Sequence, residues 1–242
     1  MKNDESHDSS FFILNLYTMI PKTEREQIIA LINREVVPAI GCTEPIAVAL
    51  CVAKATETLG CRPEKIQAYL SANILKNAMG VGIPGTGMIG LPIAIALGAL
   101  IGKSEYQLEV LKDSTPEAVE EGKKLINAQA INIALKYGIE EKLYIEITCE
   151  AKGEKATAII SGGHTNFVYV ARNEEVLLNK QNAISNETNE EDIELSLRKV
   201  YDFAITSPIE ELAFILETRN LNKKAAERSF KGSYGHHEVQ RP

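Results

Sequence analysis

Two apolar segments that are too short to cross a membrane set the strongest limit on the fold. The first runs from Ile46 to Ala55, shortly after Cys42, and the second runs from Met88 to Ile101. A bilayer-spanning helix needs about 20 consecutive apolar residues. A shorter helix that is apolar on nearly all sides belongs in a protein core. We therefore expect both segments to form buried helices of a globular domain.

Stretches in which apolar and polar residues alternate predict a sheet. Residues 65–72, and most of the stretch from about 131 to 180, have the alternation of half-buried strands. Turn sequences at residues 152–155 and 172–175 separate neighbouring stretches, which favours antiparallel pairing. We expect an α+β fold in which helices pack on a mainly antiparallel sheet, with a buried apolar N-terminal helix after Cys42.

Three local signals predict where further helices begin. Thr23 with Glu26, and Ser207 with Glu210, have the spacing of a capping box, in which both side chains bond to backbone N–H groups. Pro116 is at the first position of a predicted surface helix, where an N–H group would have no helical partner. We expect a helix to begin beside each of these signals.

The chain is expected to contain one main domain and two less ordered ends. Residues 1–18 form an expected disordered extension, and Met19 is a candidate for the true start. The apolar stretch 11–20 follows acidic residues and lacks the positive region of a signal peptide. Residues 19–222 are expected to form a substrate-side α+β domain. Residues 223–242 show no apolar period and are expected to be a truncated tail.

Charge and cysteine content argue against several classes of protein. The net charge of −7, with no basic run, argues against nucleic acid or an acidic membrane surface as a partner. The four cysteines show neither CxxC spacing nor a dense disulfide framework, which favours reduced thiols in a cytoplasmic protein. Their spacing gives no metal signal. The four are Cys42, Cys51, Cys61 and Cys149.

Cys42 is the candidate for reactivity, because it lies next to a predicted helix N-terminus. Free N–H groups and the helix dipole at that end stabilise a thiolate and would lower the pKa of the thiol. Glu44 opposes this effect electrostatically, or serves as a hydrogen-bond partner. The alternative is a small buried residue in a tight turn. For Cys51 and Cys149 we expect packing in the core.

A glycine-rich segment at residues 79–88 precedes the second apolar helix. Its backbone N–H groups are suited to an anion, although its spacing is neither that of a dinucleotide fold nor that of a P-loop. Close helix packing with a tight turn is the alternative. Lys76 and Asn77, just upstream, could add a cation and an amide for a carboxylate.

His164 follows two glycines at the end of a predicted strand, beside Thr165 and Asn166. A histidine at such a turn has room to meet a ligand, and its ordinary pKa suits acid–base chemistry. The alternative is a structural hydrogen-bond donor. The polar neighbours favour a functional role.

Taken together, four blocks resemble the amino-terminal half of the L-cysteine desulfidase family. That family includes the uncharacterised UPF0597 proteins and is related to the alpha chain of iron–sulfur L-serine dehydratases. The resemblance extends from about Met19 to about Gly235. Its blocks are residues 38–50, 73–100, 109–115 and 160–170, in the same order as in the family.

The resemblance implies a [4Fe–4S] lyase that converts L-cysteine into pyruvate, ammonia and sulfide, with Cys42 as the base that takes the α-proton. Such an elimination needs a base and a Lewis acid for the leaving sulfur. From the positions of the motifs, we expect a pocket for the small amino-acid substrate and its carboxylate. Its expected lining is Asn73, Lys76, Asn77, Gly85, Thr86, Gly87, His164, Thr165 and Asn166.

Family members are much longer, and the resemblance places their cluster ligands in the second half. It therefore implies that this chain carries no ligand of the [4Fe–4S] cluster and is inactive alone, as a fragment, a frameshifted product or a split subunit. Expected partners are a separately encoded C-terminal half and other copies in a homo-oligomer.

Three alternatives to a cysteine lyase remain open at this point. The first is a subunit of an L-serine dehydratase-like lyase. The second is a non-catalytic remnant that binds an amino acid. The third is a cofactor-free enzyme that uses Cys42 as nucleophile and His164 as base.

Overall fold

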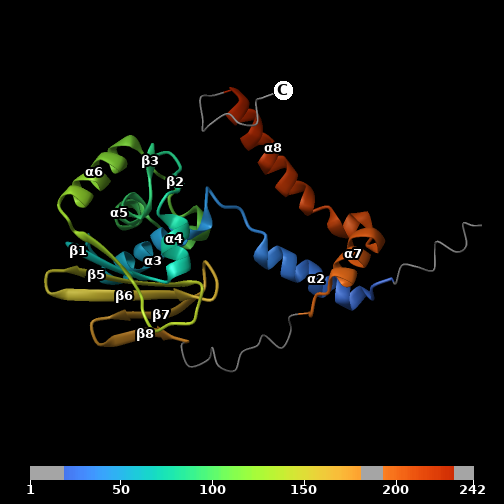
Figure 1. Cartoon of the computed structure of the whole chain (residues 1–242), viewed down its shortest axis with the longest axis horizontal. Coiled ribbons are helices and arrows are strands. Elements are labelled where there is room, and N and C mark those ends of the chain that lie inside the picture. The colour runs from blue at the N-terminus through green and yellow to red at the C-terminus, as the bar shows by residue number, and fades with distance from the viewer. Residues whose placement is uncertain (1–18, 181–192, 232–242) are drawn as a thin grey trace, which may run out of the picture. The chain divides into compact units, whose positions relative to one another are not determined.

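The chain forms two compact units (Figure 1). The computed structural model describes residues 19–180 and 193–231. Residues 38–180 make up a sheet unit, and residues 19–37 combine with 193–231 in a helical unit. The extension expected at residues 1–18 lies outside the described residues.

A six-stranded sheet organises the first unit. Its strands are β1 (Lys65–Leu70), β4 (Ile131–Leu135), β5 (Tyr144–Ala151), β6 (Glu154–Ser161), β7 (Phe167–Arg172) and β8 (Glu175–Asn179). The order across the sheet is β4-β1-β5-β6-β7-β8. β1 and β4 pair in parallel, and the remaining neighbours are antiparallel. The α+β fold with a mainly antiparallel sheet is confirmed, whereas the parallel pair was not predicted.

Three helices lie on one face of this sheet (Figure 1): α3 (Thr43–Leu59), α5 (Leu91–Ile101) and α6 (Pro116–Asn127). α3 packs directly on β5 and β6, α5 packs on α3, and α6 packs on α5. Every residue of α3 from Pro45 to Ala53 is buried, which confirms the predicted apolar helix. Pro116 begins α6 as expected, and Thr115 caps it by accepting the N–H of Ala118.

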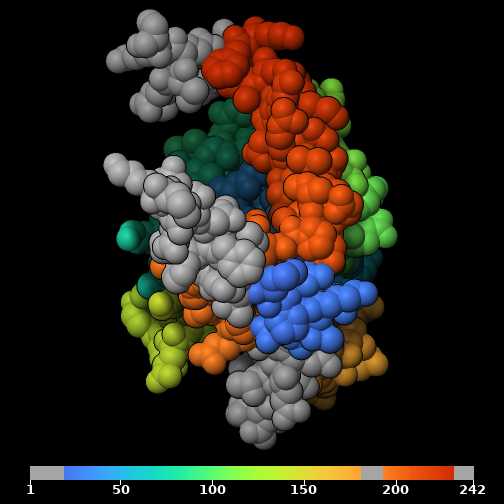
Figure 2. Space-filling view, turned by 90° about the vertical axis from the view of Figure 1, so that its right-hand side faces the viewer, coloured from blue at the N-terminus to red at the C-terminus, as the bar shows by residue number. Residues whose placement is uncertain are grey.

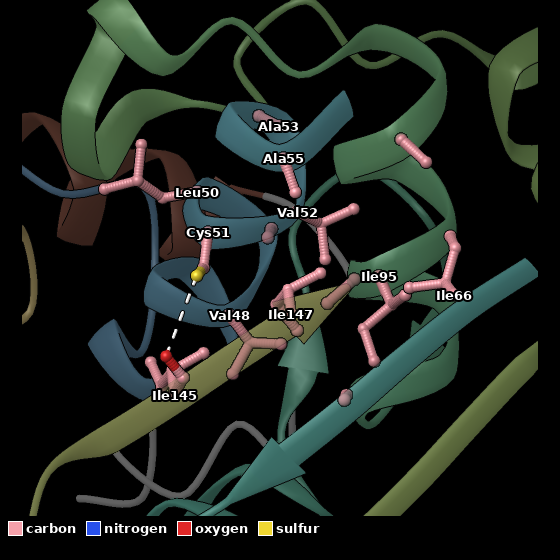
Figure 3. Packing of buried hydrophobic residues seen from close by; sticks show 14 of the residues in the cluster. Val48, Leu50, Cys51, Val52, Ala53, Ala55, Ile66, Ile95, Ile145 and Ile147 are labelled. Carbon is pink, nitrogen blue, oxygen red and sulfur yellow. Dashed lines mark hydrogen bonds between the residues drawn. The ribbon is translucent and has the colours of Figure 1, made fainter. Parts of the chain in front are cut away.

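Two buried cysteines belong to the core, as the sequence predicted. Figure 3 shows Cys51 of α3 among aliphatic side chains, with its thiol directed at the carbonyl of Ile145 at 3.8 Å. The same thiol donates to the carbonyl of Ala158 at 3.3 Å. Burial raises the pKa of Cys51 well above its usual range and that of Cys149 to about 12. Both thiols therefore stay protonated and act as small apolar groups.

Glycines allow these helices to approach one another closely. A Cβ on Gly98 of α5 would lie 2.6 Å from the carbonyl oxygen of Ala49 in α3. A Cβ on Gly122 of α6 would lie 3.0 Å from Ile93 of α5. A side chain at position 98 would meet the backbone of α3 and force the two helices apart, whereas at position 122 it would require Ile93 to shift by a few tenths of an ångström.

The segment between β1 and α5 contains α4 (Ala72–Ala78), β2 (Gly82–Ile83) and β3 (Met88–Ile89). The last two pair as a small antiparallel hairpin. The sequence predicted a glycine-rich loop here, and the structure adds two short strands to it. After α5, the 3-10 helix η1 (Ser104–Glu109) leads towards α6.

The helical unit consists of α2 (Lys22–Glu35), α7 (Leu197–Thr206), the 3-10 helix η2 (Ile209–Leu212) and α8 (Ile215–Lys231). Figure 2 looks onto α2 in blue and onto α7 and α8 in orange and red. A bidentate ion pair joins Arg25 of α2 to Glu211 of η2 at 2.8 and 2.9 Å. α8 extends to Lys231, so residues 223–231 of the expected tail are helical, and residues 232–242 lie outside the described residues.

Both predicted capping boxes are wrong. α2 begins two residues earlier than expected, with Pro21 in place of Thr23 as its N-cap and no side-chain cap. Ser207 ends α7 instead of beginning a helix, because the proline that follows it favours an extended backbone at position 207. The next helical turn, η2, starts after Pro208 and likewise has no side-chain cap.

Candidate functional site

Three segments that are far apart in the sequence meet at the N-terminus of α3. Cys42 is the N-cap residue, and Glu44 lies in the first turn. Asn77 of α4 donates to Glu44 Oε1 at 3.3 Å. His164, in the turn after β6, is close enough for its charge to lower the pKa of Glu44. We call these four residues the Glu44 cluster.

The Cys42 thiol is a hydrogen-bond donor in this cluster. Its Sγ donates to Glu44 Oε2 at 2.9 Å. Burial raises the pKa of the thiol, and its hydrogen bond to the Glu44 carboxylate raises it further. The expectation that the helix N-terminus would lower this pKa is therefore wrong. The carboxylate and the partial burial outweigh the helix dipole, so the thiol is protonated at neutral pH.

Glu44 is the centre of the cluster; the sequence predicted it as a hydrogen-bond partner of Cys42, which is confirmed, but did not include it among the substrate-binding residues. The hydrogen bond from Cys42 lowers the pKa of Glu44 most, although burial opposes it, and its own backbone N–H, Asn77 and the charge of His164 lower it further. The helix dipole also favours a negative charge in the first turn of α3. Glu44 is thus ionised at neutral pH. Its position two residues after Cys42, in a first turn, was the available sequence signal.

One face of α4 supplies the polar groups upstream of the glycine-rich hairpin. Lys76 and Asn77 are three and four residues after Asn73 on α4, so the three side chains share one side of the helix. All three are exposed. Of this side of α4, Asn77 contacts Glu44. The same side of the helix carries two amides and one ammonium group, which are suited to an anion.

The glycine-rich hairpin lies directly beside the turn that precedes Cys42. A Cβ on Gly41 would lie 2.9 Å from Cγ of Pro84, so Gly41 is needed for this contact. Gly85 and Gly87, at the hairpin tip, have φ of 75° and 64°. The hydroxyl of Thr86 donates to Ile83 O at 2.7 Å and accepts from the N–H of Met88 at 3.0 Å. Thr86 therefore stabilises the tip, and the open sides of Gly85 and Gly87 leave the backbone accessible.

The turn between β6 and β7 holds the third predicted group. Asn166 donates through Nδ2 to Ser161 O at 2.9 Å, and its backbone N–H donates to Gly163 O. Asn166 thus fixes the turn that carries His164. Thr165 is exposed. The structure gives His164 the electrostatic contact and Asn166 the supporting role.

Within residues 19–180 and 193–231, no three His, Cys, Asp or Glu side chains gather in a way that could hold a metal ion. Cys51 and Cys149 are in the core, and Cys42 is bonded to Glu44. A [4Fe–4S] cluster needs several thiolates around one point. The described residues therefore do not fit the cluster that the family resemblance implies.

The Glu44 cluster has the groups needed to hold and transfer a proton beside a bound anion. A protonated thiol and an ionised carboxylate share a hydrogen bond, and an imidazole lies near the carboxylate. A cationic ligand group that pairs with Glu44 would weaken the hold of Glu44 on the Cys42 proton and favour the thiolate. The thiolate formed in this way would be a base, and α4 would bind a negative group of the same ligand.

Replacing Glu44 by glutamine is expected to speed alkylation of Cys42 at pH 8 by about threefold to tenfold, because the Glu44 carboxylate raises the pKa of the thiol through its hydrogen bond and its charge, and glutamine carries no charge. Iodoacetamide labelling across a pH series, read by peptide mass spectrometry, measures this rate. Cys61 is the internal reference, and Glu57→Gln on the far turn of α3 is the matched control. Unchanged or slower labelling of Cys42 would contradict the assignment.

Three relatives align with most of the length of this chain, and each is described as a UPF0597 protein. The protein from Phocaeicola vulgatus is 78% identical over 218 residues, which are 90% of this chain and 51% of that protein. The Porphyromonas gingivalis protein is 51% identical, over 88% of this chain and 50% of its own length. The Chromobacterium violaceum protein is 41% identical, over 85% and 48% respectively. The chain spans about half the length of the curated relatives it matches.

Two further comparisons bear on the chain. No protein-family profile matches it, and no solved structure does. Among the described helices, none combines the length and the apolar character needed to cross a membrane.

Proposed function

Because the chain belongs to the UPF0597 family over nine tenths of its length, we propose that it is the substrate-side part of a lyase resembling L-cysteine desulfidase. The substrate is a small amino acid, and the products from L-cysteine are pyruvate, ammonia and sulfide. The observation that carries the proposal is the hydrogen bond of 2.9 Å between the Cys42 thiol and Glu44, at a helix N-terminus faced by α4.

The arrangement supports binding of an amino acid through both its ammonium and its carboxylate group. The substrate ammonium pairs with the Glu44 carboxylate, and the substrate carboxylate binds to Asn73 and Lys76 on α4. Pairing with the ammonium withdraws Glu44 from the thiol, and the added positive charge favours the Cys42 thiolate. The thiolate takes the α-proton, the electrons of the Cα–H bond form the Cα=Cβ double bond, and the Cβ–S bond breaks with its electrons leaving on the sulfur. The 2-aminoacrylate formed in this way tautomerises to the imine, which water hydrolyses to pyruvate and ammonia.

In this proposal, the half of the relatives that the chain does not span supplies the ligands of the [4Fe–4S] cluster. The described residues do not fit a [4Fe–4S] cluster, so we assign the ligands of that cluster to a polypeptide equivalent to the other half of the relatives. The chain is then inactive alone and active in the complex. L-Serine is the second candidate substrate, because the same contacts to the ammonium and the carboxylate would bind any small amino acid with a leaving group on Cβ.

A cofactor-free Cys–His enzyme is less well supported than the lyase. In such a pair the histidine must take the proton of the thiol. Here the thiol proton is directed to Glu44, and the charge of His164 also acts on Glu44. The carboxylate therefore stands where the base of that mechanism would be.

The test is anaerobic assembly of the chain with the unmatched half of the Phocaeicola vulgatus protein, expressed separately and supplied with iron and sulfide. Pyruvate is measured by a coupled dehydrogenase assay with L-cysteine and with L-serine, and each half alone is the control. We expect pyruvate from L-cysteine in the mixture and none from either half. A stable complex with its cluster loaded that binds L-cysteine without forming pyruvate would contradict the lyase and favour a binding module.

A further inference from the structure

The outer side of β4 carries backbone groups that bond to nothing in residues 19–180 and 193–231. β4 is the last strand in the order across the sheet, and it pairs with β1. Ile66 donates its N–H to Ala130 O, and Lys136 donates its N–H to Leu70 O, so the even-numbered residues of β4 bond to β1. The N–H and C=O groups of the odd-numbered residues therefore point away from β1. These residues are Ile131, Ile133 and Leu135.

β4 lacks the features that usually keep a sheet edge from pairing with another strand. Such features are prolines, charged side chains and bulges. β4 contains no proline and no charged residue, and its register with β1 is unbroken. β8, at the other end of the sheet order, begins with Glu175 and has a register shift in its pairing with β7. The edge at β4 is therefore the better suited of the two to pair with a further strand.

The sequence of β4 is complementary to itself. In an antiparallel pair of two copies centred on Ile133, that residue faces the partner's Ile133, and Ile131 faces the partner's Leu135. These are the residues whose N–H and C=O groups point outward, so each opposed pair exchanges two hydrogen bonds. No outward group of either strand is then left over. Any other antiparallel register leaves outward groups of β4 without a partner in the second β4.

The same register also matches the side chains of the strand. The odd-numbered residues stand opposite buried residues of β1, so their side chains lie on the helix-covered face of the sheet. Ile131 and Ile133 pack against the core but are only partly buried, and a second copy would extend this apolar row and bury it further. Lys136, the one charged residue within 128–138, would face the partner's Ala130, so no like charges would meet.

We propose that β4 pairs with β4 of a second copy of this chain, in a twofold antiparallel contact centred on Ile133. The two six-stranded sheets form one continuous sheet. The helices of both copies lie on the same face of it, because opposed residues of an antiparallel pair point to the same side. This inference goes beyond the proposed function and depends neither on lyase chemistry nor on the half of the relatives that the chain does not span.

Two charge variants of the full chain test both the contact and its register. In the proposed pair, Asn132 faces the partner's Ala134, on the sheet face away from the helices. Asn132→Lys with Ala134→Lys places lysine opposite lysine, whereas the matched control, Asn132→Lys with Ala134→Glu, places lysine opposite glutamate. Both variants lose the same hydrogen bond to Gln67, and circular dichroism checks that both are folded. Sedimentation equilibrium gives the dissociation constant of each chain.

We expect a dimer for the native chain, at least about tenfold weaker association for the double-lysine variant, and association of the control at least as tight as that of the native chain. Amide hydrogen exchange of Ile131, Ile133 and Leu135 should slow as the concentration of the native chain rises. Each of four results would overturn the proposal. They are a native monomer up to about 0.1 mM, a dimer that the double-lysine variant does not weaken, equal weakening in both variants, and slow exchange of these amides already in the monomer.

Discussion

Replacing Cys42 by alanine is expected to lower pyruvate formation by the assembled complex by about 10²- to 10⁴-fold, because the variant lacks the group that takes the α-proton. The substrate should still bind, since Glu44 and α4 make the proposed contacts with its charged groups. The measurement is kcat and KM for L-cysteine. We expect the loss in kcat, with KM changed little.

Two further variants make this result specific. Cys61→Ala removes another partly exposed thiol of the sheet unit and should leave turnover unchanged. Cys42→Ser keeps a donor for Glu44, but a hydroxyl is a far weaker acid than a thiol, so turnover should remain low. If Cys42→Ala retained more than about a tenth of the native rate, Cys42 would not be the base.

Gly98→Ala is expected to lower the free energy of unfolding by about 2 to 3 kcal/mol. The new Cβ would meet the carbonyl oxygen of Ala49 at 2.6 Å, and Cα of Ala49 and Cβ of Val52 at 3.1 Å. Two of these atoms belong to the backbone of α3, which is buried against the sheet and cannot move alone. The gain in helix propensity from alanine, about 0.5 to 1 kcal/mol, does not offset the clash. Urea unfolding followed by circular dichroism measures the change.

Gly80→Ala is the matched control for this experiment. A Cβ at position 80 would meet nothing within 4 Å, and φ there is not positive. We expect its unfolding free energy to stay within about 0.5 kcal/mol of the native value. If Gly98→Ala were as stable as this control, the close contact between α3 and α5 would not limit stability.

Much of the sheet unit could be predicted from local patterns. The burial of α3 follows from an apolar run that is too short to cross a membrane. The antiparallel strands β5 to β8 follow from alternating apolar and polar residues separated by short turns. The parallel pair of β1 and β4 could not be predicted in this way. Ile66 pairs with Ile131, and no local pattern records a partner so distant in the sequence.

The candidate site was predictable in its members more than in its contacts. Cys42, Asn77 and His164 were expected, and the structure places them around Glu44. The direction of the pKa shift of Cys42 depends on its burial and on where its proton points, and both are tertiary properties. Thr86 and Asn166 were expected to line a pocket, yet their hydrogen bonds run within their own turns. Sequence identifies polar residues near a turn, whereas only the fold shows which of them are already engaged.

The pairing of β1 with β4 also bears on the order in which the chain folds. It closes a long loop that contains α4, the glycine-rich hairpin, α5 and α6, whereas β5 to β8 are joined by short turns. Closing a long loop costs more chain entropy than closing a short one, so local hairpins form earlier. His164 belongs to the early meander, and Asn77 belongs to the enclosed loop. We therefore expect the Glu44 cluster to assemble only in the last step of folding, when β4 joins the edge of the sheet.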